Sequence, residues 1–206
     1  VDHADGEDTK VLQSALVKLE SKAKLLAGTL TAQIGKHRGQ SVLKAMDPGL
    51  LDLPVIHPGP ARSGGSITEP LRTGRYIDGV DHEFVTVNHG MTVGMTDAGK
   101  TYEAYYKVTE MLTRIDVVVF WNDPIKGMQS AGPVLAGVDW AAQDEREAKL
   151  MLKAIMAAIG ARTNELGRLG YTKWTAEVYR KHKIPKLFVK FEEGAWLIES
   201  GTLVKI

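Results

Sequence analysis

Apolar residues recur at alternating spacings of four and three along the start of the chain, between residues 12 and 30. This spacing places them along one face of a helix, and we predict a helix that ends near residues 35–39. The apolar face is narrow, as in helices that pack on another helix. We expect Leu12, Leu19 and Leu26 to contact a partner chain. The alternative is a surface helix that packs on the core of its own chain.

Proline and glycine are concentrated between residues 46 and 79. Proline removes a backbone donor and glycine raises chain entropy, so regular elements are expected to be scarce there. A structureless segment of this length is usually functional or bound to a partner. The sequence therefore predicts three parts: an N-terminal helix in residues 1–45, an extended arm or linker in residues 46–79, and a mixed α/β domain in residues 80–206.

The second half of the chain alternates strand-like and helix-like patterns. Short strands are predicted from apolar and β-branched runs at residues 84–87, 91–95, 115–121, 186–191 and 196–198. An apolar stripe predicts a long helix that Asp139 caps and that ends near Gly167 or Gly170. The expected fold class is α+β, or loosely α/β, with a small mixed sheet covered by the long helix.

Residues 94–101 read Gly-Met-Thr-Asp-Ala-Gly-Lys-Thr. This fits the P-loop pattern of glycine, four residues, and Gly-Lys-Ser/Thr. In such a loop, glycines such as Gly94 and Gly99 let backbone N–H groups surround phosphates. A lysine, here Lys100, neutralises charge, and a hydroxyl, here Thr101, binds magnesium.

The same segment has an alternative interpretation, a β-hairpin that turns at residues 97–100. A P-loop directly follows a buried strand and opens a helix, whereas a turn sequence at residues 88–90 interrupts the strand pattern before Gly94. The pattern of residues 102–112 fits a helix as well as a strand, but the three tyrosines and the valine of residues 102–108 favour a strand. We prefer the hairpin, in which Lys100 is solvent-exposed. In the P-loop alternative, Asp123 is the nearest carboxylate for magnesium.

A second group of polar residues contains side-chain types that bind zinc, manganese or iron. Its members are Asp78, Asp81, His82, Glu83 and His89. The spacing between the two histidines allows them to bridge a strand and its neighbour. The alternative is a solvated turn before a strand.

Composition narrows the function classes. The balance of 26 basic against 25 acidic residues gives no electrostatic reason to expect nucleic acid or an anionic membrane as a partner. The absence of cysteine excludes disulfides, thiolate nucleophiles and Cys-ligated metals. No apolar run reaches the ~18–20 residues that span a bilayer. No cofactor is predicted.

The leading functional hypothesis is a non-catalytic structural or assembly subunit of a virion, a tail or another multi-subunit complex. Its partners are other protein chains, in a homo- or hetero-oligomer. The alternative is a nucleotide- or phosphate-binding protein, or an NTPase, that uses residues 94–101. A metal-dependent enzyme at His82 and His89 is a third hypothesis, so the sequence leaves open whether the protein is an enzyme.

Overall fold

The computed structural model describes residues 9–37, 40–51, 56–76, 78–86, 89–95 and 97–194. The chain divides into two compact units, Val1–His57 with Gly74–His82 and Pro58–Thr73 with Glu83–Ile206. The predicted α+β fold, with a long helix and small sheets, is confirmed. Within the described part of the chain, no helix is long and apolar enough to span a bilayer.

The first unit contains α1 (Thr9–Ala23), β1 (Leu30–Ile34), β2 (Ser41–Ala45) and the 3-10 helix η1 (Pro48–Leu51). β1 and β2 form an antiparallel pair, and α1 packs against β1. Two side chains of α1 form hydrogen bonds with the backbone of β1. Glu20 Oε1 accepts one from Leu30 N at 2.7 Å, and Gln13 Nε2 donates one to Ala32 O at 3.2 Å. The N-terminal helix therefore packs on a hairpin of its own unit.

The predicted extent of the first helix is wrong, because α1 ends at Ala23. The next residue, Lys24, has a φ of 56°, and Gly28 has a φ of 85°. This left-handed backbone stops the helix and turns the chain into β1. Leu26 consequently lies outside α1, so the apolar face predicted from the spacing is not continuous on one helix.

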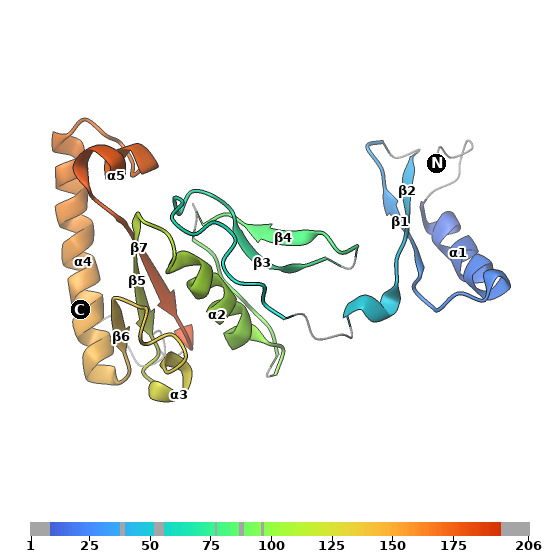
Figure 1. Cartoon of the computed structure of the whole chain (residues 1–206), viewed down its shortest axis with the longest axis horizontal. Coiled ribbons are helices and arrows are strands. Elements are labelled where there is room, and N and C mark those ends of the chain that lie inside the picture. Colours follow the sequence, from blue (N-terminus) through green and yellow to red (C-terminus); the bar gives the residue numbers. More distant parts are fainter. Residues whose placement is uncertain are drawn as a thin grey trace. The chain divides into compact units, whose positions relative to one another are not determined.

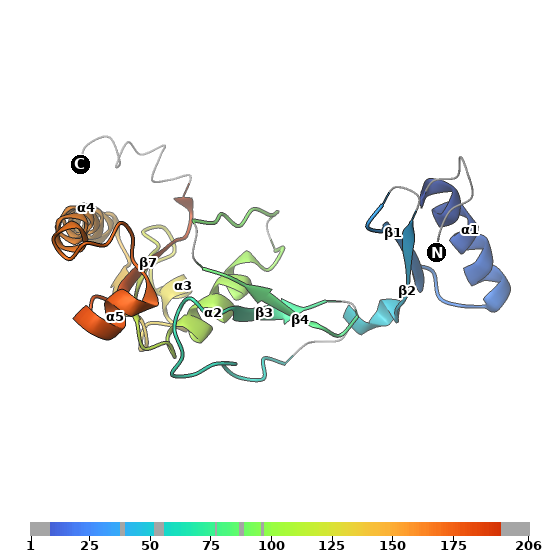
Figure 2. The same cartoon turned by 90° about the horizontal axis from the view of Figure 1, so that it is seen from above.

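The remainder of the chain contains β3 (Leu71–Arg75), β4 (Asp81–Phe84), α2 (Lys100–Met111), β5 (Val117–Asn122), α3 (Met128–Ala131), β6 (Trp140–Ala142), α4 (Glu145–Arg168), α5 (Ala176–His182) and β7 (Lys186–Phe191). β3 and β4 form a two-stranded sheet. β6, β5 and β7 form a parallel sheet in that order, and both views place it between α4 and α2 (Figures 1 and 2).

Each face of the parallel sheet is covered by a helix. On one face, α2 buries Val108 and Met111 in a cluster with Val119 and Trp121 of β5. On the other face, α4 buries side chains against Phe120 and Val189, namely Ala148 and Met151. Burial on both faces explains the nearly continuous apolar sequence of β5.

Part of the segment predicted to be an extended arm belongs to this core. Ile67 and Leu71 are buried in the cluster between α2 and β5. Asp116 anchors the segment, because its Oδ1 accepts a hydrogen bond from Ile67 N at 2.7 Å and its Oδ2 accepts one from Ser66 Oγ at 2.5 Å. Regular structure is also present within residues 46–79, in η1 and β3.

Two predicted strands differ from the structure. β4 ends at Phe84 and pairs with β3, and residues 89–95 have no regular secondary structure. The predicted strand at residues 196–198 lies outside the described residues, as does Val87. The strand predicted at residues 186–191 is confirmed as β7.

The long helix begins later than predicted. Asp144 caps α4, since its side chain accepts a hydrogen bond from Glu147 N at 2.8 Å. Glu147 Oε2 in turn accepts a hydrogen bond from Gln143 N at 2.8 Å, which fixes the residue that precedes the cap. Asp139, the predicted cap, instead accepts a hydrogen bond from Val119 N and links the start of β6 to β5.

Candidate functional site

The helix α2 begins within the P-loop-like sequence. Its first residue is Lys100, and its N-cap Gly99 has a φ of 81°. The preferred prediction of a hairpin at residues 97–100 is therefore wrong. The tyrosines favour a strand locally, but Ala104 and Val108 lie on one helical face and are buried, and this burial outweighs propensity.

Lys100 folds back over the loop that precedes it. Its Nζ donates hydrogen bonds to Gly94 O at 2.8 Å and Met95 O at 2.7 Å. Ala98 N also donates to Met95 O, at 3.2 Å. The lysine thus closes the described part of residues 94–100 into a compact loop in front of the helix.

Both glycines of the pattern stand where a side chain would be costly. At Gly94 an added Cβ would lie 3.3 Å from Ala98 Cβ, which is a tight contact. At Gly99 the left-handed backbone favours glycine. The first N–H groups of a helix have no intrahelical acceptor, and with the helix dipole they form a site suited to anions.

One structural condition for a P-loop is met and another is not. The helix that should follow the loop is α2. The strand that should precede Gly94 is missing from the described residues, because residues 89–95 are irregular and Met91, Val93 and Met95 are largely exposed. The described part of the loop thus has the helix of a P-loop but not the strand.

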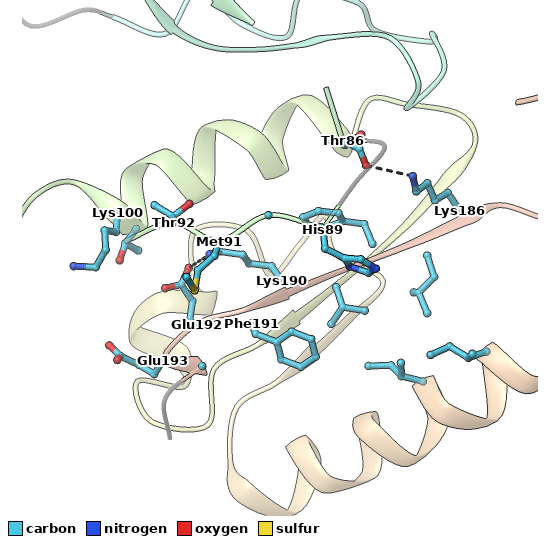
Figure 3. A pocket seen from close by; sticks show the side chains of 18 of the residues that line it. Thr86, His89, Met91, Thr92, Lys100, Lys186, Lys190, Phe191, Glu192 and Glu193 are labelled. Atoms are coloured by element: carbon cyan, nitrogen blue, oxygen red, sulfur yellow. Dashed lines mark hydrogen bonds and ion pairs between the residues drawn. The ribbon is translucent and has the colours of Figure 1, made fainter. Parts of the chain in front are cut away.

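A large open pocket of about 1530 Å³ lies beside this loop. Gly99, Lys100 and Thr101 line it, together with Glu192 and Glu193 (Figure 3). The glutamates directly follow β7, and Phe191 at its end is in register with Asn122 at the end of β5. The pocket therefore includes the carboxyl edge of a parallel sheet, where α/β proteins commonly bind ligands.

Glu192 is held close to the end of β5. Its backbone N donates to Asn122 O at 2.9 Å, and the residue is only 9% exposed. Its Oε1 lies 3.2 Å from Lys190 Nζ but makes no well-directed hydrogen bond. A nearly buried carboxylate without a full set of donors is a strong acceptor for a cation.

Glu193 and Lys126 form an ion pair at the same pocket, with 2.9 Å between Lys126 Nζ and Glu193 Oε1. The hydrogen bond that the Lys126 ammonium donates to Glu193 raises the pKa of Lys126 above its ordinary value, burial opposes this with a smaller effect, and the charges of nearby carboxylates add to the increase. Glu193 has a φ of 46°, which is uncommon for a residue other than glycine. Such strained positions are concentrated at functional sites.

Asp123, the magnesium ligand expected in the P-loop interpretation, has a different place in the structure. It is fully buried, and its Oδ1 accepts hydrogen bonds from Ile125 N at 3.1 Å and Lys126 N at 2.9 Å. Ser130 Oγ donates to its Oδ2. The carboxylate is thus occupied in shaping the turn after β5, and the described carboxylates that line the pocket are those of Asp97, Glu192 and Glu193.

Sequence reasoning missed these two glutamates, although a signal was present. They directly follow a predicted apolar strand, as Asp123 nearly does. The two strands differ in their position in the sheet. β5 lies in the centre between β6 and β7, whereas β7 borders the pocket, so the carboxylates that follow β7 line it. The sequence does not reveal that order.

The two histidines of the metal hypothesis belong to different units of the chain. The His82 ring packs edge-on against Tyr76, with 5.1 Å between ring centroids. His89 lines the pocket (Figure 3). Across the described ranges, no three His, Asp or Glu side chains form a group that could hold a metal. The histidine pair stays a sequence-level hypothesis.

The three leucines of the predicted partner interface are placed differently from one another. Leu12 is half-buried in α1, Leu19 is 51% exposed on the same helix, and Leu26 is exposed beyond its end. Leu16, between the first two, is buried within the unit. Contact with a partner chain stays a prediction for these residues.

Comparison with known proteins leaves the function to be argued from the site itself. No protein-family model, no curated protein and no solved structure matches the chain.

Proposed function

We propose that the second unit binds a nucleoside triphosphate together with Mg²⁺. The phosphates would lie on residues 94–101, and the metal between Thr101 and Glu192. The observation that supports this most is the loop geometry: α2 begins at Lys100, and the Lys100 ammonium lies over Gly94 O and Met95 O.

Phosphate binding would use the helix and the lysine together. The N-terminal N–H groups of α2 offer donors and a favourable dipole to an anion. Lys100 Nζ now contacts neutral carbonyl oxygens at a partly exposed position. A phosphate oxygen would give the same ammonium a charge-assisted hydrogen bond, which is roughly twice as strong as a neutral one.

The metal would be held by few protein groups. Magnesium in nucleotide sites usually keeps several waters and takes one or two carboxylates plus phosphate oxygens. Glu192 provides a carboxylate with an Oε1 that lacks a well-directed hydrogen bond, and Thr101 provides a hydroxyl on the first turn of α2. Both residues line the same pocket.

The proposal is tested by calorimetric titration of the protein with ATP and with GTP, with and without MgCl₂. We expect micromolar binding of at least one nucleotide, strengthened by Mg²⁺. Glu192→Gln should weaken the Mg²⁺-dependent part about tenfold, since one carboxylate ligand is lost. Glu145→Gln, an exposed change on α4, is the matched control. Absence of saturable binding at millimolar nucleotide would refute the proposal.

A second candidate function, an assembly subunit, is supported by the surface of the first unit. Its helix and hairpin leave apolar side chains exposed, including Val17, Leu19, Ile34 and Leu43. Exposed apolar patches often mark protein–protein contacts. The two functions are compatible, because they use different units of the chain.

We expect the wild-type chain to associate at micromolar concentrations and Leu19→Asp to reduce that association. A charge at this position would have to be desolvated in an interface, whereas it is tolerated on an exposed helix face. Light scattering coupled to size exclusion measures the change, and circular dichroism checks the fold. Ser21→Asp, at an exposed position of α1, is the control. A monomeric wild type at all concentrations would contradict this function.

A further inference from the structure

The outer edge of β7 opens into the pocket. The sheet order places β5 on one side of β7, and within the described part of the chain no strand pairs with its other side. The backbone N–H groups of Lys186 and Glu192 point toward β5, where they donate to carbonyl oxygens. Because successive residues of a strand alternate, the N–H and C=O groups of Leu187, Val189 and Phe191 point to the outer edge. All residues of β7 line the pocket.

We propose that a second copy of this chain covers this edge, with the two β7 strands antiparallel and Val189 of one copy opposite Val189 of the other. An unpaired strand edge is a template for pairing with another chain. The two parallel sheets then form one continuous sheet about a twofold axis, which is the usual symmetry of homodimers. The inference goes beyond the proposed function, because it assigns an assembly surface to the second unit.

Backbone geometry restricts how two β7 strands can be aligned. In an antiparallel pair, residues whose N–H and C=O groups point outward stand opposite one another. A symmetric pairing is therefore centred on a residue and not on a peptide bond. Centring it on Val189 pairs the strand over its whole length. A centre at Phe188 sets Lys186 opposite Lys190, and a centre at Lys190 sets that lysine opposite itself, and like charges directly opposite are destabilising.

The Val189 register places Lys186 of each copy opposite Glu192 of the other. Lys186 Nζ donates to Thr86 O at 3.2 Å and lies over the Trp174 ring, and none of the described carboxylates forms an ion pair with it. Burial lowers the pKa of Lys186 below its ordinary value, against a smaller opposing effect of Asp116. A partly desolvated ammonium is costly unless a carboxylate is paired with it.

Glu192 has the complementary deficiency at the other end of the strand (Figure 3). It is 9% exposed, and its Oε1 makes no hydrogen bond although Lys190 Nζ lies 3.2 Å away. In the dimer, the ammonium of Lys186 of the second copy supplies the missing donor, and symmetry forms this pair twice. Opposite charges directly across an antiparallel pair are stabilising. The proposed function assigns the same carboxylate to Mg²⁺, so metal binding and this pairing exclude each other.

The α4 face of the same register is apolar. Val189 packs on this face, and the alternation of the strand places Leu187 and Phe191 beside it. In the Val189 register, Leu187 stands opposite Phe191 of the second copy. Ile155 and Ile159 of α4 line the pocket along this edge, and Ile159 is 52% exposed. Pairing of the two edges therefore also removes apolar surface from water.

Single cysteines test the register, because the chain has no cysteine of its own. Val189→Cys should form an intermolecular disulfide under mild oxidation, since facing residues have Cα atoms about 5.5 Å apart, within the range of disulfides. Phe191→Cys is the matched control, because its two copies are separated by about 13 Å along the strand and should not cross-link. An equimolar mixture of Leu187→Cys and Phe191→Cys should cross-link. Non-reducing electrophoresis of the full chain, in EDTA and without nucleotide, measures the three products.

Charge reversal tests the ion pair. Lys186→Glu and Glu192→Lys each place like charges opposite one another, and each should associate at least about tenfold more weakly than wild type in sedimentation equilibrium. Their equimolar mixture should recover association, because both pairs then form between unlike copies. Circular dichroism checks that each variant is folded. Folded variants that associate like wild type, or a mixture that does not recover, overturn the inference.

The cross-linking result also separates this surface from the others. Leu19→Asp, in the first unit, should leave the Val189→Cys cross-link unchanged, and failure of nucleotide binding would refute only the phosphate site. No cross-link through Val189→Cys, or an equal yield from Phe191→Cys, overturns the inference. The edge would then be left to another occupant, either residues 195–206 of the same chain or a different protein.

Discussion

Replacing Lys100 with alanine is expected to lower the affinity for the proposed ligand, a nucleoside triphosphate, about 10- to 100-fold. The change removes a charge-assisted hydrogen bond to phosphate, and such bonds contribute about 1.5–3 kcal/mol. The fold should be little affected, because the ammonium contacts only Gly94 O and Met95 O at a partly exposed position. We expect a change of no more than ~0.5 kcal/mol in the free energy of unfolding.

Wild type and Lys100→Ala are each titrated with ATP and with GTP in the presence of Mg²⁺, and the free energy of unfolding of each is measured in urea. Lys153→Ala is the control, since Lys153 is exposed on α4 and does not line the pocket. Equal affinity of Lys100→Ala and wild type would remove the lysine from the proposed phosphate site. A large loss of stability in Lys100→Ala would show instead that its contacts with the loop carbonyls maintain the fold.

The sequence pointed to this segment but not to its conformation. The spacing of Gly94, Gly99, Lys100 and Thr101 was visible as a pattern. Local propensity then favoured a strand after Lys100, whereas the structure has a helix because a sheet lies beneath it. Propensity is a weak guide wherever a tertiary contact of this size is formed. The spacing of the buried apolar residues of α2, which lie on one helical face, is the feature that predicts the helix.

In the first unit, the spacing of apolar residues does not predict where the helix ends. Leucines continue at helical spacing beyond Ala23, although the chain reverses at Lys24 and enters β1. The same residues satisfy a helical pattern and an alternating strand pattern where the segment is short. β7, by contrast, was predicted with its observed bounds, because Pro185 and the glutamates mark both of its ends.

The buried ion pair of Arg114 and Glu110 links the segment after residue 58 to α2. Both side chains are fully buried, with 3.3 Å between Arg114 Nη2 and Glu110 Oε2. Arg114 Nη1 also donates to Arg62 O at 2.5 Å, and Glu110 Oε1 accepts from Ala61 N at 2.8 Å. The pair thus provides hydrogen bonds to a stretch of backbone within the segment that the sequence predicts to be an extended arm or linker.

Arg114→Met is therefore expected to reduce the free energy of unfolding by about 3–5 kcal/mol, because it leaves the Glu110 carboxylate buried without a cation. Cleavage by a nonspecific protease should accelerate within residues 58–70, which are anchored in the wild type. Urea unfolding and mass mapping of the fragments measure the two effects.

Two further variants make the result specific to the buried pair. Arg146→Met removes an exposed arginine of α4. It should change neither the free energy of unfolding nor the rate of cleavage within residues 58–70. Adding Glu110→Gln to Arg114→Met should recover part of the lost stability, since no buried charge is then left unpaired. If Arg114→Met loses less than about 1 kcal/mol and residues 58–70 are cut at the wild-type rate, the ion pair does not hold this segment, and the anchors at Ile67 and Asp116 must be sufficient.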